Sequence, residues 1–477
     1  MKSKDVQELE KKLTYKNENA WNRYSEKQRE KIDKLAEEYK RFLDQGKTER
    51  ECVAACIKLL EKNGFVNGDL KETLVPGDRI YRNIRNKGLV ASVIGTEPVL
   101  DGVNILGAHI DSPHIDLKPM PLYEDSGMAL LKTHYYGGIK KYQWSTIPLA
   151  LHGVMYNSDG QKVYVTVGED ENDPVFTINE LLIHLSQEQM ARKASEAVKG
   201  EELNVLVGGL PVSDDKDVKE SVKLGVLKLL NDKYGITEKD FMTAEIELVP
   251  AHKAKDVGFD RSYVGAYGQD DRVCAYTSLA AVMKVKNPAR TCVCLFSDKE
   301  EVGSIGNTGA LSFLYENALM ELAVKVNGNC SSWEFRRLLD RSHMLSSDVT
   351  AAFDPTYASA YDKSNTAFAG CGVCLMKYTG SRGKSGSNDA HSEFFSAVAG
   401  IFEKEDIPWQ TGELGRVDLG GGGTIAADMA NKGMNVIDCG VPVLSMHSPF
   451  EVTSKADIYS TYEGFVAFLK KMKNVND

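Results

Sequence analysis

The chain has 477 residues, and its 42% hydrophobic and 26% charged residues are ordinary proportions for a globular protein. Its 68 acidic residues outnumber the 58 basic ones, and the net charge of -10 disfavours a nucleic-acid-binding surface. No apolar run approaches the roughly 18 residues of a membrane span, and the initial MKSKDVQELEKK has no apolar core of the kind a signal peptide needs. We therefore expect a cytoplasmic protein that binds neither nucleic acid nor a membrane.

Residues 1–65 have the pattern of helices. Apolar residues from Ile32 to Leu43 recur at helical spacing, and Gly46 supplies a stop. Thr48 followed by Glu51 is a capping box that opens the next helix. The many Lys and Glu residues indicate a solvated helical arm without a catalytic role.

Short strands begin at Arg79. The apolar run from Val103 to Leu106 predicts a buried strand that ends at Gly107 and releases His109 and Asp111 into a loop. Ligand sites of open α/β sheets lie at such strand exits.

Residues 120–255 differ from the rest, with aromatic and Gly residues, several strand-like pieces and one helix at about 222–230. Apart from isolated histidines, this block shows no cluster of candidate ligands. We predict a β-rich insertion at 120–255 that interrupts a catalytic domain formed by residues 1–119 and 256–477.

The α/β rhythm returns after Gly268. Asp270 opens a predicted helix, and a predicted strand at 291–297 leads to the pair Glu300 and Glu301. Two further strands lead to Asp348 and His447. This alternation predicts an α/β fold in which a mixed sheet lies between helices.

Imidazole and carboxylate groups recur at the ends of these elements. Together they are the ligand set that suits Zn, Mn or Co, whereas Ca or Mg prefers oxygen alone. Two metal ions about 3.5–4 Å apart need a shared ligand, which a short carboxylate provides well. We predict a site for two divalent ions, bridged by Asp270 and completed by four more ligands: His109 and Asp348 on one ion, Glu301 and His447 on the other.

Two acidic residues beside these ligands have predicted catalytic roles. Asp111, two residues after His109, is placed to orient its imidazole. Glu300 is the expected general base, because side chains of neighbouring residues on a strand-like backbone diverge and Glu301 is held by a metal.

Each signal has an ordinary structural alternative. A histidine after a strand is often a packing residue, an acidic pair is often solvated, and an Asp at a helix start is often only a cap. The glycines at 420–423 precede a helix and resemble a phosphate loop, but they lack the GxxxxGK[ST] pattern. Contact between their backbone N–H groups and a peptide carbonyl or carboxylate fits better, with Gly422 as the candidate.

The motifs resemble those of the M18 family of aminopeptidases, in the family's order over about residues 70–470. The matching segments are HIDSP at 109–113, GQDDR at 268–272, SDKEEVGS at 297–304, SSD at 346–348 and SMHS at 445–448. The run GGGGTIA at 420–426 is closer to the aminopeptidase I branch than to the aspartyl aminopeptidase branch. The resemblance implies the same metal ligands and the same base. One departure is Asp271, where the family usually has Asn.

The resemblance also implies roles for the insertion. In M18 enzymes it mediates dimerisation, and dimers assemble into a tetrahedral dodecamer. His152 is then a candidate for entering the active site of a neighbouring subunit, with a packed histidine as the alternative.

Outside the insertion, Lys377 matches a family position that lines the substrate pocket. The alternative is an ordinary surface lysine.

The predicted activity is hydrolysis of the N-terminal residue from peptides with a free N-terminus, by a water that bridges two metal ions and is activated by Glu300. Alternatives are a dinuclear-metal carboxypeptidase or N-acyl amino-acid deacylase, and a non-catalytic assembly protein. Lys377, Lys384 and Arg416 allow a pocket for acidic residues, whereas the aminopeptidase I resemblance implies neutral or apolar ones.

Overall fold

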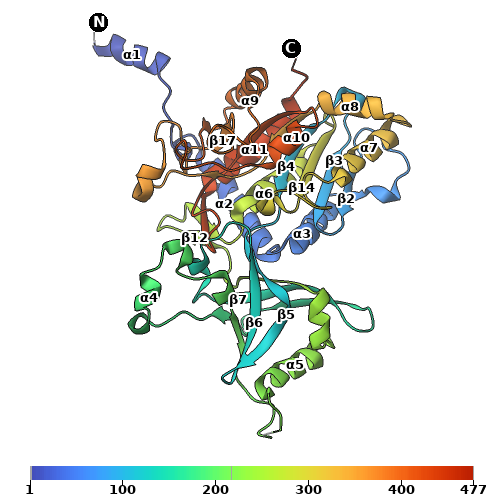
Figure 1. The fold of residues 1–477 in the computed structure, drawn as a ribbon. Coiled ribbons are helices and arrows are strands. Elements are labelled where there is room, and N and C mark those ends of the chain that lie inside the picture. Colours follow the sequence, from blue (N-terminus) through green and yellow to red (C-terminus); the bar gives the residue numbers. More distant parts are fainter. Residues whose placement is uncertain (1–2, 216, 476–477) are drawn as a thin grey trace.

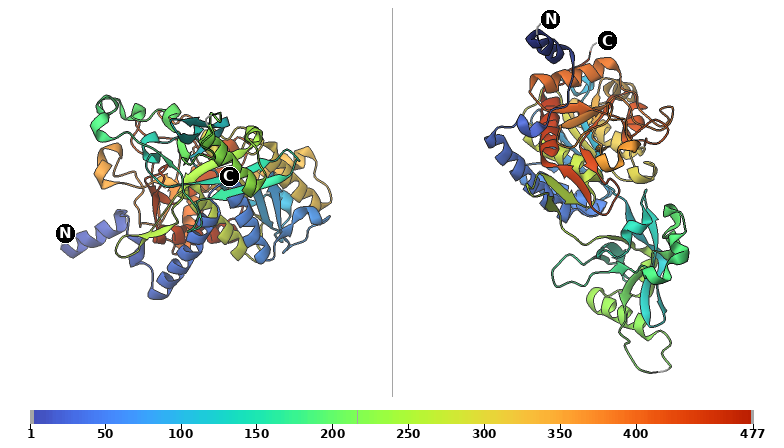
Figure 2. Two further views of the ribbon diagram at one scale, coloured as in Figure 1. Left: turned by 90° about the horizontal axis from the view of Figure 1, so that it is seen from below. Right: turned by 90° about the vertical axis from the view of Figure 1, so that its left-hand side faces the viewer.

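The computed structural model describes residues 3–215 and 217–475. A large α/β part carries the central sheet, and a smaller part, built on a second sheet, projects from it (Figures 1 and 2). The first helix, α1 (Ser3–Leu13), extends away from both (Figure 1). No helix in the described ranges is long and apolar enough to cross a membrane.

The central sheet has nine strands and mixed directions, which confirms the predicted α/β fold. Four adjacent strands, β14, β4, β15 and β19, are parallel, and the antiparallel β3 and β17 flank them. In spatial order the strands are β1 (Val66–Asn67), β2 (Arg79–Ile84), β3 (Gly88–Val93), β14 (Cys292–Ser297), β4 (Asn104–His109), β15 (His343–Ser346), β19 (Asn435–Gly440), β17 (Val373–Met376) and β18 (Trp409–Thr411).

Helices cover both faces of this sheet, so every residue of β4 and β14 is buried. Leu106 packs on one face, in the core shared with α2 (Glu26–Gln45), α3 (Glu49–Lys62), α6 (Gln269–Lys284), α9 (Ser392–Lys404) and α11 (Lys455–Lys471). Ile105 packs on the other face, with α7 (Phe313–Asn327), α8 (Ser332–Asp340) and α10 (Ile425–Ala430).

The predicted helix boundaries near the N-terminus agree with the structure. Thr48 and Glu51 form the expected capping box: the Thr48 hydroxyl accepts from the Glu51 N–H at 3.2 Å, and the Glu51 carboxylate accepts from the Thr48 N–H at 3.3 Å. Gly46 caps the end of α2. The helical arm therefore packs on the central sheet through α2 and α3.

The second sheet, which we call sheet B, has seven strands and carries α5 (Ser221–Tyr234) (Figure 1). Its spatial order is β8 (Lys162–Val167), β7 (Leu149–Tyr156), β11 (Glu245–Pro250), β5 (His114–Asp125), β6 (Met128–Tyr136), β10 (Val205–Gly208) and β9 (Thr177–Ile178). The first strand of sheet B along the chain is β5. It starts before residue 120, because the chain enters β5 directly after the His109 loop. The division of the chain at 120 and 255 stays a prediction.

A small third sheet connects the two parts. Its order is β12 (Lys255–Val257), β13 (Tyr263–Ala266), β21 (Glu451–Ser454), β20 (Pro442–Leu444) and β16 (Thr350–Ala351). β13 leads into α6, and β20 and β21 flank the turn with His447. This sheet therefore places Asp270 and His447 near each other, although they are far apart in sequence.

Candidate metal centre

Three of the predicted site segments leave the same edge of the central sheet. His109 is the last residue of β4, and its register partner Ser297 is the last residue of the parallel strand β14. Asp348 follows β15, which also runs parallel to β4. The carboxyl ends of parallel strands thus bring His109, Asp348 and the glutamate pair together.

Asp270 lies between the two predicted histidine ligands. Its Oδ1 is 3.2 Å from Nε2 of His109, and its Oδ2 is 3.2 Å from Nε2 of His447. Its backbone is held on both sides: the N–H donates to Oε2 of Glu451 at 3.0 Å, and the carbonyl accepts from the Ser112 hydroxyl at 2.6 Å. One carboxylate therefore faces two imidazoles with one oxygen each.

The other predicted ligands complete two groups that share Asp270. Oδ1 of Asp348 is 3.9 Å from Nε2 of His109, and Oε2 of Glu301 is 3.5 Å from Nε2 of His447. In each group the donor atoms lie within 4.8 Å of one another. His109, Glu300 and Glu301 form a third such group.

Asp271, the acid next to Asp270, belongs to none of these groups in the described part of the chain. It is fully buried, and neither carboxylate oxygen has a hydrogen-bond partner among the described residues. Burial and the charge of Asp270 raise the pKa of its carboxyl well above the usual value. The geometry favours Asp270 for the shared position.

The carboxyl groups of the cluster strongly affect one another. Burial, with the nearby charge of Asp270, raises the pKa of Glu301 well above its usual value, and burial with the charge of Asp271 does the same for Asp348. Burial lowers the pKa of His109, but the carboxylates of Asp111 and Asp270 outweigh it and hold the pKa well above normal. Such a concentration of buried acids favours a bound cation.

Two buried donor atoms also fit a metal. Nε2 of His109 and Oε1 of Glu301 have no hydrogen-bond partner within the described ranges. An unsatisfied polar atom in the interior is costly, and coordination to an ion would satisfy both. The mixture of imidazole and carboxylate suits zinc and similar ions.

Asp111 lies behind His109. Nδ1 of His109 lies 3.1 Å from the backbone carbonyl oxygen of Asp111 and 3.3 Å from its Oδ1, and the two carboxylate oxygens accept from the backbone N–H groups of Glu300 and Glu301, each at 3.2 Å. Tyr136 donates its hydroxyl to Oδ2 of Asp111 at 2.8 Å. The carboxylate thus lies between the imidazole and the turn with the glutamate pair, and its role in orienting His109 stays a prediction.

The glutamate pair does not lie on strand-like backbone, and that part of the prediction is wrong. Glu300–Val302 is a single 3-10 turn, entered through Lys299 with φ 67° and left through Gly303 with φ 95°. The two side chains nevertheless differ in exposure, since 18% of the Glu300 side chain is exposed and only 3% of the Glu301 side chain. Burial raises the pKa of Glu300 to about 7.

No sequence pattern indicated that Glu451 and the Gly138 carbonyl would contact His447. Oε1 of Glu451 accepts from the His447 N–H at 2.7 Å, and the Gly138 carbonyl lies 2.9 Å from Nδ1 of His447. If Nδ1 carries the proton and donates to that carbonyl, Nε2 is unprotonated, faces Asp270 and can ligate a metal ion. Glu451 is a single acid after a Pro-Phe pair, and Gly138 contributes only its backbone carbonyl. Neither gives a recognisable sequence pattern.

The predicted substrate residues lie outside the donor groups. His152, on β7, is buried, with Nδ1 2.8 Å from Oε1 of Glu51 and Nε2 3.1 Å from Oε1 of Glu169. Within one chain it therefore packs against two acids, which favours the packing alternative. Nζ of Lys377, at the end of β17, is 3.6 Å from Oδ1 of Asp389. The Gly422 carbonyl accepts from the Gly380 N–H at 2.6 Å.

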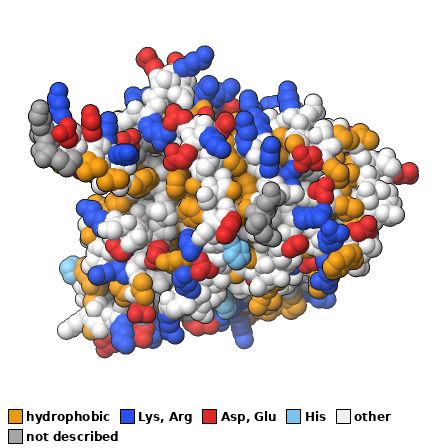
Figure 3. Space-filling view, turned by 90° about the horizontal axis from the view of Figure 1, so that it is seen from above, with side chains coloured by type: hydrophobic (Ala, Val, Ile, Leu, Met, Phe, Trp, Pro, Cys, Tyr) orange, Lys and Arg blue, Asp and Glu red, His pale blue; other side chains and the backbone are white. Residues whose placement is uncertain are grey.

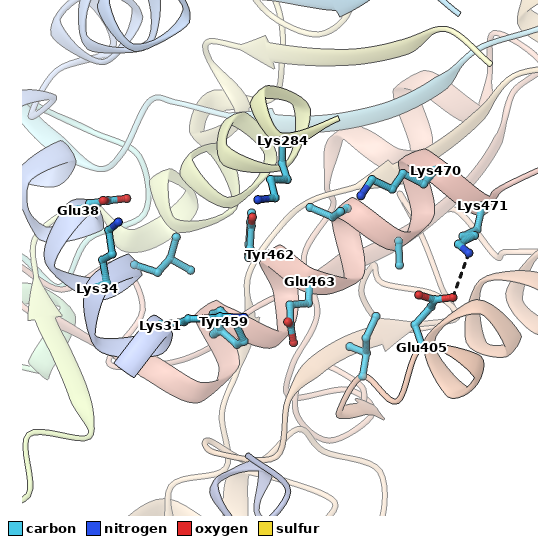
Figure 4. Close-up of a pocket in the computed structure, with 14 residues that line it drawn as sticks. Lys31, Lys34, Glu38, Lys284, Glu405, Tyr459, Tyr462, Glu463, Lys470 and Lys471 are labelled. Carbon is cyan, nitrogen blue, oxygen red and sulfur yellow. Dashed lines mark ion pairs between the residues drawn. The ribbon is translucent and has the colours of Figure 1, made fainter. Parts of the chain in front are cut away.

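A separate surface hollow of about 480 Å³ is bordered by lysines from α2, α6 and α11 (Figure 4). Lys31, Lys34 and Lys284 lie along it, and Lys471 pairs with Glu405 at 3.4 Å. It contains none of the predicted site residues. In Figure 3 basic and acidic side chains are interspersed over the face seen from above, as on an ordinary mixed surface.

The mixed α/β fold and the imidazole and carboxylate groups at its strand ends together fit a metal-dependent enzyme. The family model for the aminopeptidase I zinc metalloproteases (M18) matches residues 42–469. The chain belongs to the M18 family, which confirms the resemblance seen in the motifs.

Known relatives cover nearly the whole chain. A probable M18 family aminopeptidase 1 of Clostridium acetobutylicum is 53% identical over 455 residues, 94% of this chain and 97% of that protein. The crystal structure of an M18 aminopeptidase from Thermotoga maritima is 43% identical and covers 96% of this chain and 100% of its own, with a TM-score of 0.93. A structure described as the S. cerevisiae mApe1 dodecamer is 20% identical, covers 92% of this chain and 96% of its own at a TM-score of 0.73, and shows a similar fold. The chain is therefore an M18 metallo-aminopeptidase.

Proposed function

We propose that this aminopeptidase binds two divalent metal ions between β4, β14 and β15 and uses Glu300 as its general base. The position of Asp270, with one oxygen toward each of two histidines, carries the proposal. One ion would be held by His109, Asp270 and Asp348, the other by Asp270, Glu301 and His447. Bound there, the ions would polarise the scissile carbonyl and make water easier to deprotonate.

Zinc is the proposed metal, with Mn or Co as alternatives. The family description names zinc, and a ligand set of two imidazoles and three carboxylates suits all three ions. The number of ions per chain is part of the proposal.

Glu300 has the properties of a proton acceptor. Its Oε2 is 3.9 Å from Nε2 of His109, and its side chain is the more open of the glutamate pair. A pKa of about 7 lets the carboxylate take a proton from the attacking water near neutral pH. The same carboxyl would then give the proton to the leaving amine.

The substrate we propose is a peptide with a free N-terminus. Its free α-amine, once neutral, would offer one of the ions a basic nitrogen ligand that an acylated N-terminus lacks, so the site favours a free end over a blocked one. Lys377 and Gly422 remain proposed substrate contacts. Both Lys377 and Lys384 lie near Asp389, at 3.6 and 2.8 Å, which reduces their net positive charge and supports a preference for neutral or apolar residues.

We also propose a homo-oligomer, with a dimer-based dodecamer as the specific hypothesis. The fold match to a yeast protein described as a dodecamer supports it. So do Leu182, Ile183 and Leu185, apolar residues that are 58–70% exposed in the segment after β9. In such an assembly His152 would contact a neighbouring active site only after exchanging one of its present partners.

The cytoplasmic location stays a proposal. All nine cysteines are unpaired in the structure, and seven of them are buried. Free thiols of this kind support a reducing compartment.

A substrate panel tests the activity. Metal-free protein would be given Zn, Mn or Co and then offered chromogenic aminoacyl substrates and their N-acetylated counterparts. We expect turnover only of free amines and only with a metal. Equal turnover of the acetylated substrates would refute the aminopeptidase proposal in favour of a deacylase.

A further inference from the structure

The segment from Tyr136 to Gly138, at the end of β6, reaches from sheet B into the donor cluster. A Cβ added at Gly137 would lie 3.4 Å from Cβ and Oε2 of Glu301, and one added at Gly138 would lie 3.4 Å from Nδ1 of His447. The backbone thus packs directly against two candidate ligands. The sequence assigned this region only to an oligomerisation insertion.

Tyr136 makes the most specific contact of this segment. Its hydroxyl donates to Oδ2 of Asp111 at 2.8 Å, and its ring stacks on His114 with centroids 4.3 Å apart and planes at 15°. Asp111 is 1% exposed. Tyr136 is therefore a fixed donor to a buried carboxylate.

Asp111 in turn contacts both His109 and the turn with the glutamate pair. Its Oδ1 approaches Nδ1 of His109 at 3.3 Å, and its oxygens accept from the N–H groups of Glu300 and Glu301. A rotation of this carboxylate would disturb the imidazole and the turn with the glutamates together. Hydrogen bonds behind a ligand fix its orientation and tune its affinity for metal.

We propose that Tyr136 is a positioning residue of the hydrolytic centre: by holding Asp111, it orients His109 and the turn that carries Glu300 and Glu301. The inference rests on the proposed function. The Gly138 carbonyl acts similarly on His447, by accepting its Nδ1–H at 2.9 Å. Sheet B therefore supplies groups that complete the centre within its own chain.

The test is Tyr136→Phe, which keeps the ring and its stacking on His114 and removes the hydroxyl. We expect zinc affinity, measured by competition with a chromogenic chelator, to fall about 10- to 100-fold. We expect kcat to fall with little change in KM, since Tyr136 is not proposed to touch substrate. The metal-free protein should still unfold in one cooperative transition, with its unfolding temperature lowered only by the loss of one hydrogen bond to a buried carboxylate.

Tyr135→Phe is the matched control on the same strand. Tyr135 is 39% exposed, and no hydrogen bond of its hydroxyl occurs in the described part of the chain. We expect wild-type zinc affinity and turnover. A loss equal to that of Tyr136→Phe would overturn the inference, because the effect would not depend on the Asp111 contact.

A double-mutant cycle with Asp111→Asn tests the route of the effect. If Tyr136 acts through Asp111, Tyr136→Phe should cause little further loss of zinc affinity in the Asp111→Asn background. Fully additive losses would overturn the inference, as would an unchanged zinc affinity of the single variant Tyr136→Phe. A wild-type protein that binds no zinc would instead overturn the proposed metal centre, and the inference with it.

Discussion

At the scale of residues, Glu300 and Glu301 are neighbours with different surroundings. Glu301 is almost fully buried and faces His447, whereas Glu300 is more open and lies nearer His109. Glu300 belongs to neither of the two donor groups that share Asp270. This difference is the structural basis for assigning one residue to a metal and the other to the proton.

Replacing Glu300 with Gln tests that assignment. The amide keeps the size of the side chain but cannot accept a proton, so we expect kcat to fall about 10²- to 10⁴-fold. Metal content, measured by elemental analysis, should stay at the wild-type level. Near-normal turnover would exclude Glu300 as the base.

Replacing Asp270 with Ala tests the shared ligand. We expect loss of bound metal on elemental analysis, because both donor groups lose a member. Asp271→Asn is the control: Asp271 belongs to neither donor group among the described residues, and the amide keeps the size of its buried side chain, so the variant should retain the metal. The opposite pattern, with metal lost only from the Asp271 variant, would move the bridge to Asp271.

The clustering of the residues in the donor groups was predictable from sequence, because apolar runs that end in His, Asp or Glu mark strand exits at a shared edge. Glu451, Tyr136 and Gly138 were not, because their contacts depend on tertiary packing. Tyr136 reaches Asp111 only through the way sheet B leaves the central sheet. The turn at Glu300 also depends on Lys299, a non-glycine residue at positive φ that no pattern marks.

At the scale of elements, β15 holds a buried histidine. His343 is 2% exposed, stacks on Phe394 at 5.4 Å, and its Nε2 has no hydrogen-bond partner among the residues described. Burial and the nearby charge of Arg290 lower its pKa to about 4. β15 therefore carries a neutral imidazole in the folded protein.

This histidine makes stability depend on pH. His343 takes up a proton near pH 6.5 in the unfolded chain but only near pH 4 in the folded protein. Its contribution to the free energy of unfolding is therefore complete above about pH 6.5 and is lost as the pH falls toward 4. The slope is at most about 1.4 kcal/mol per pH unit. We expect His343→Gln to reduce the difference in unfolding free energy between pH 7 and pH 5, measured in urea. An unchanged difference would mean that His343 is not held neutral.

At the scale of the whole molecule, the mixed central sheet followed from the sequence because central strands such as β4 and β14 are mostly apolar and buried along their whole length. The start of sheet B at His114 did not, because β5 begins with polar residues directly after the His109 loop. The role of His152 belongs to this scale, since it depends on whether a second chain is present.

His152→Gln separates the two hypotheses for that residue. A contact with a neighbouring active site predicts lower turnover with unchanged metal content and thermal stability. Packing alone predicts a lower unfolding temperature, because Glu51 and Glu169 lose their shared partner. Light scattering of both proteins would show whether the variant keeps the wild-type assembly.

The central claim is a centre for two metal ions that share Asp270. Its most direct test is to strip the protein with a chelator, add zinc in steps and record turnover of an aminoacyl chromogenic substrate against ions bound per chain. We predict no turnover in the stripped protein and full turnover at two ions per chain. Full turnover at one ion per chain, or in the metal-free protein, would contradict it.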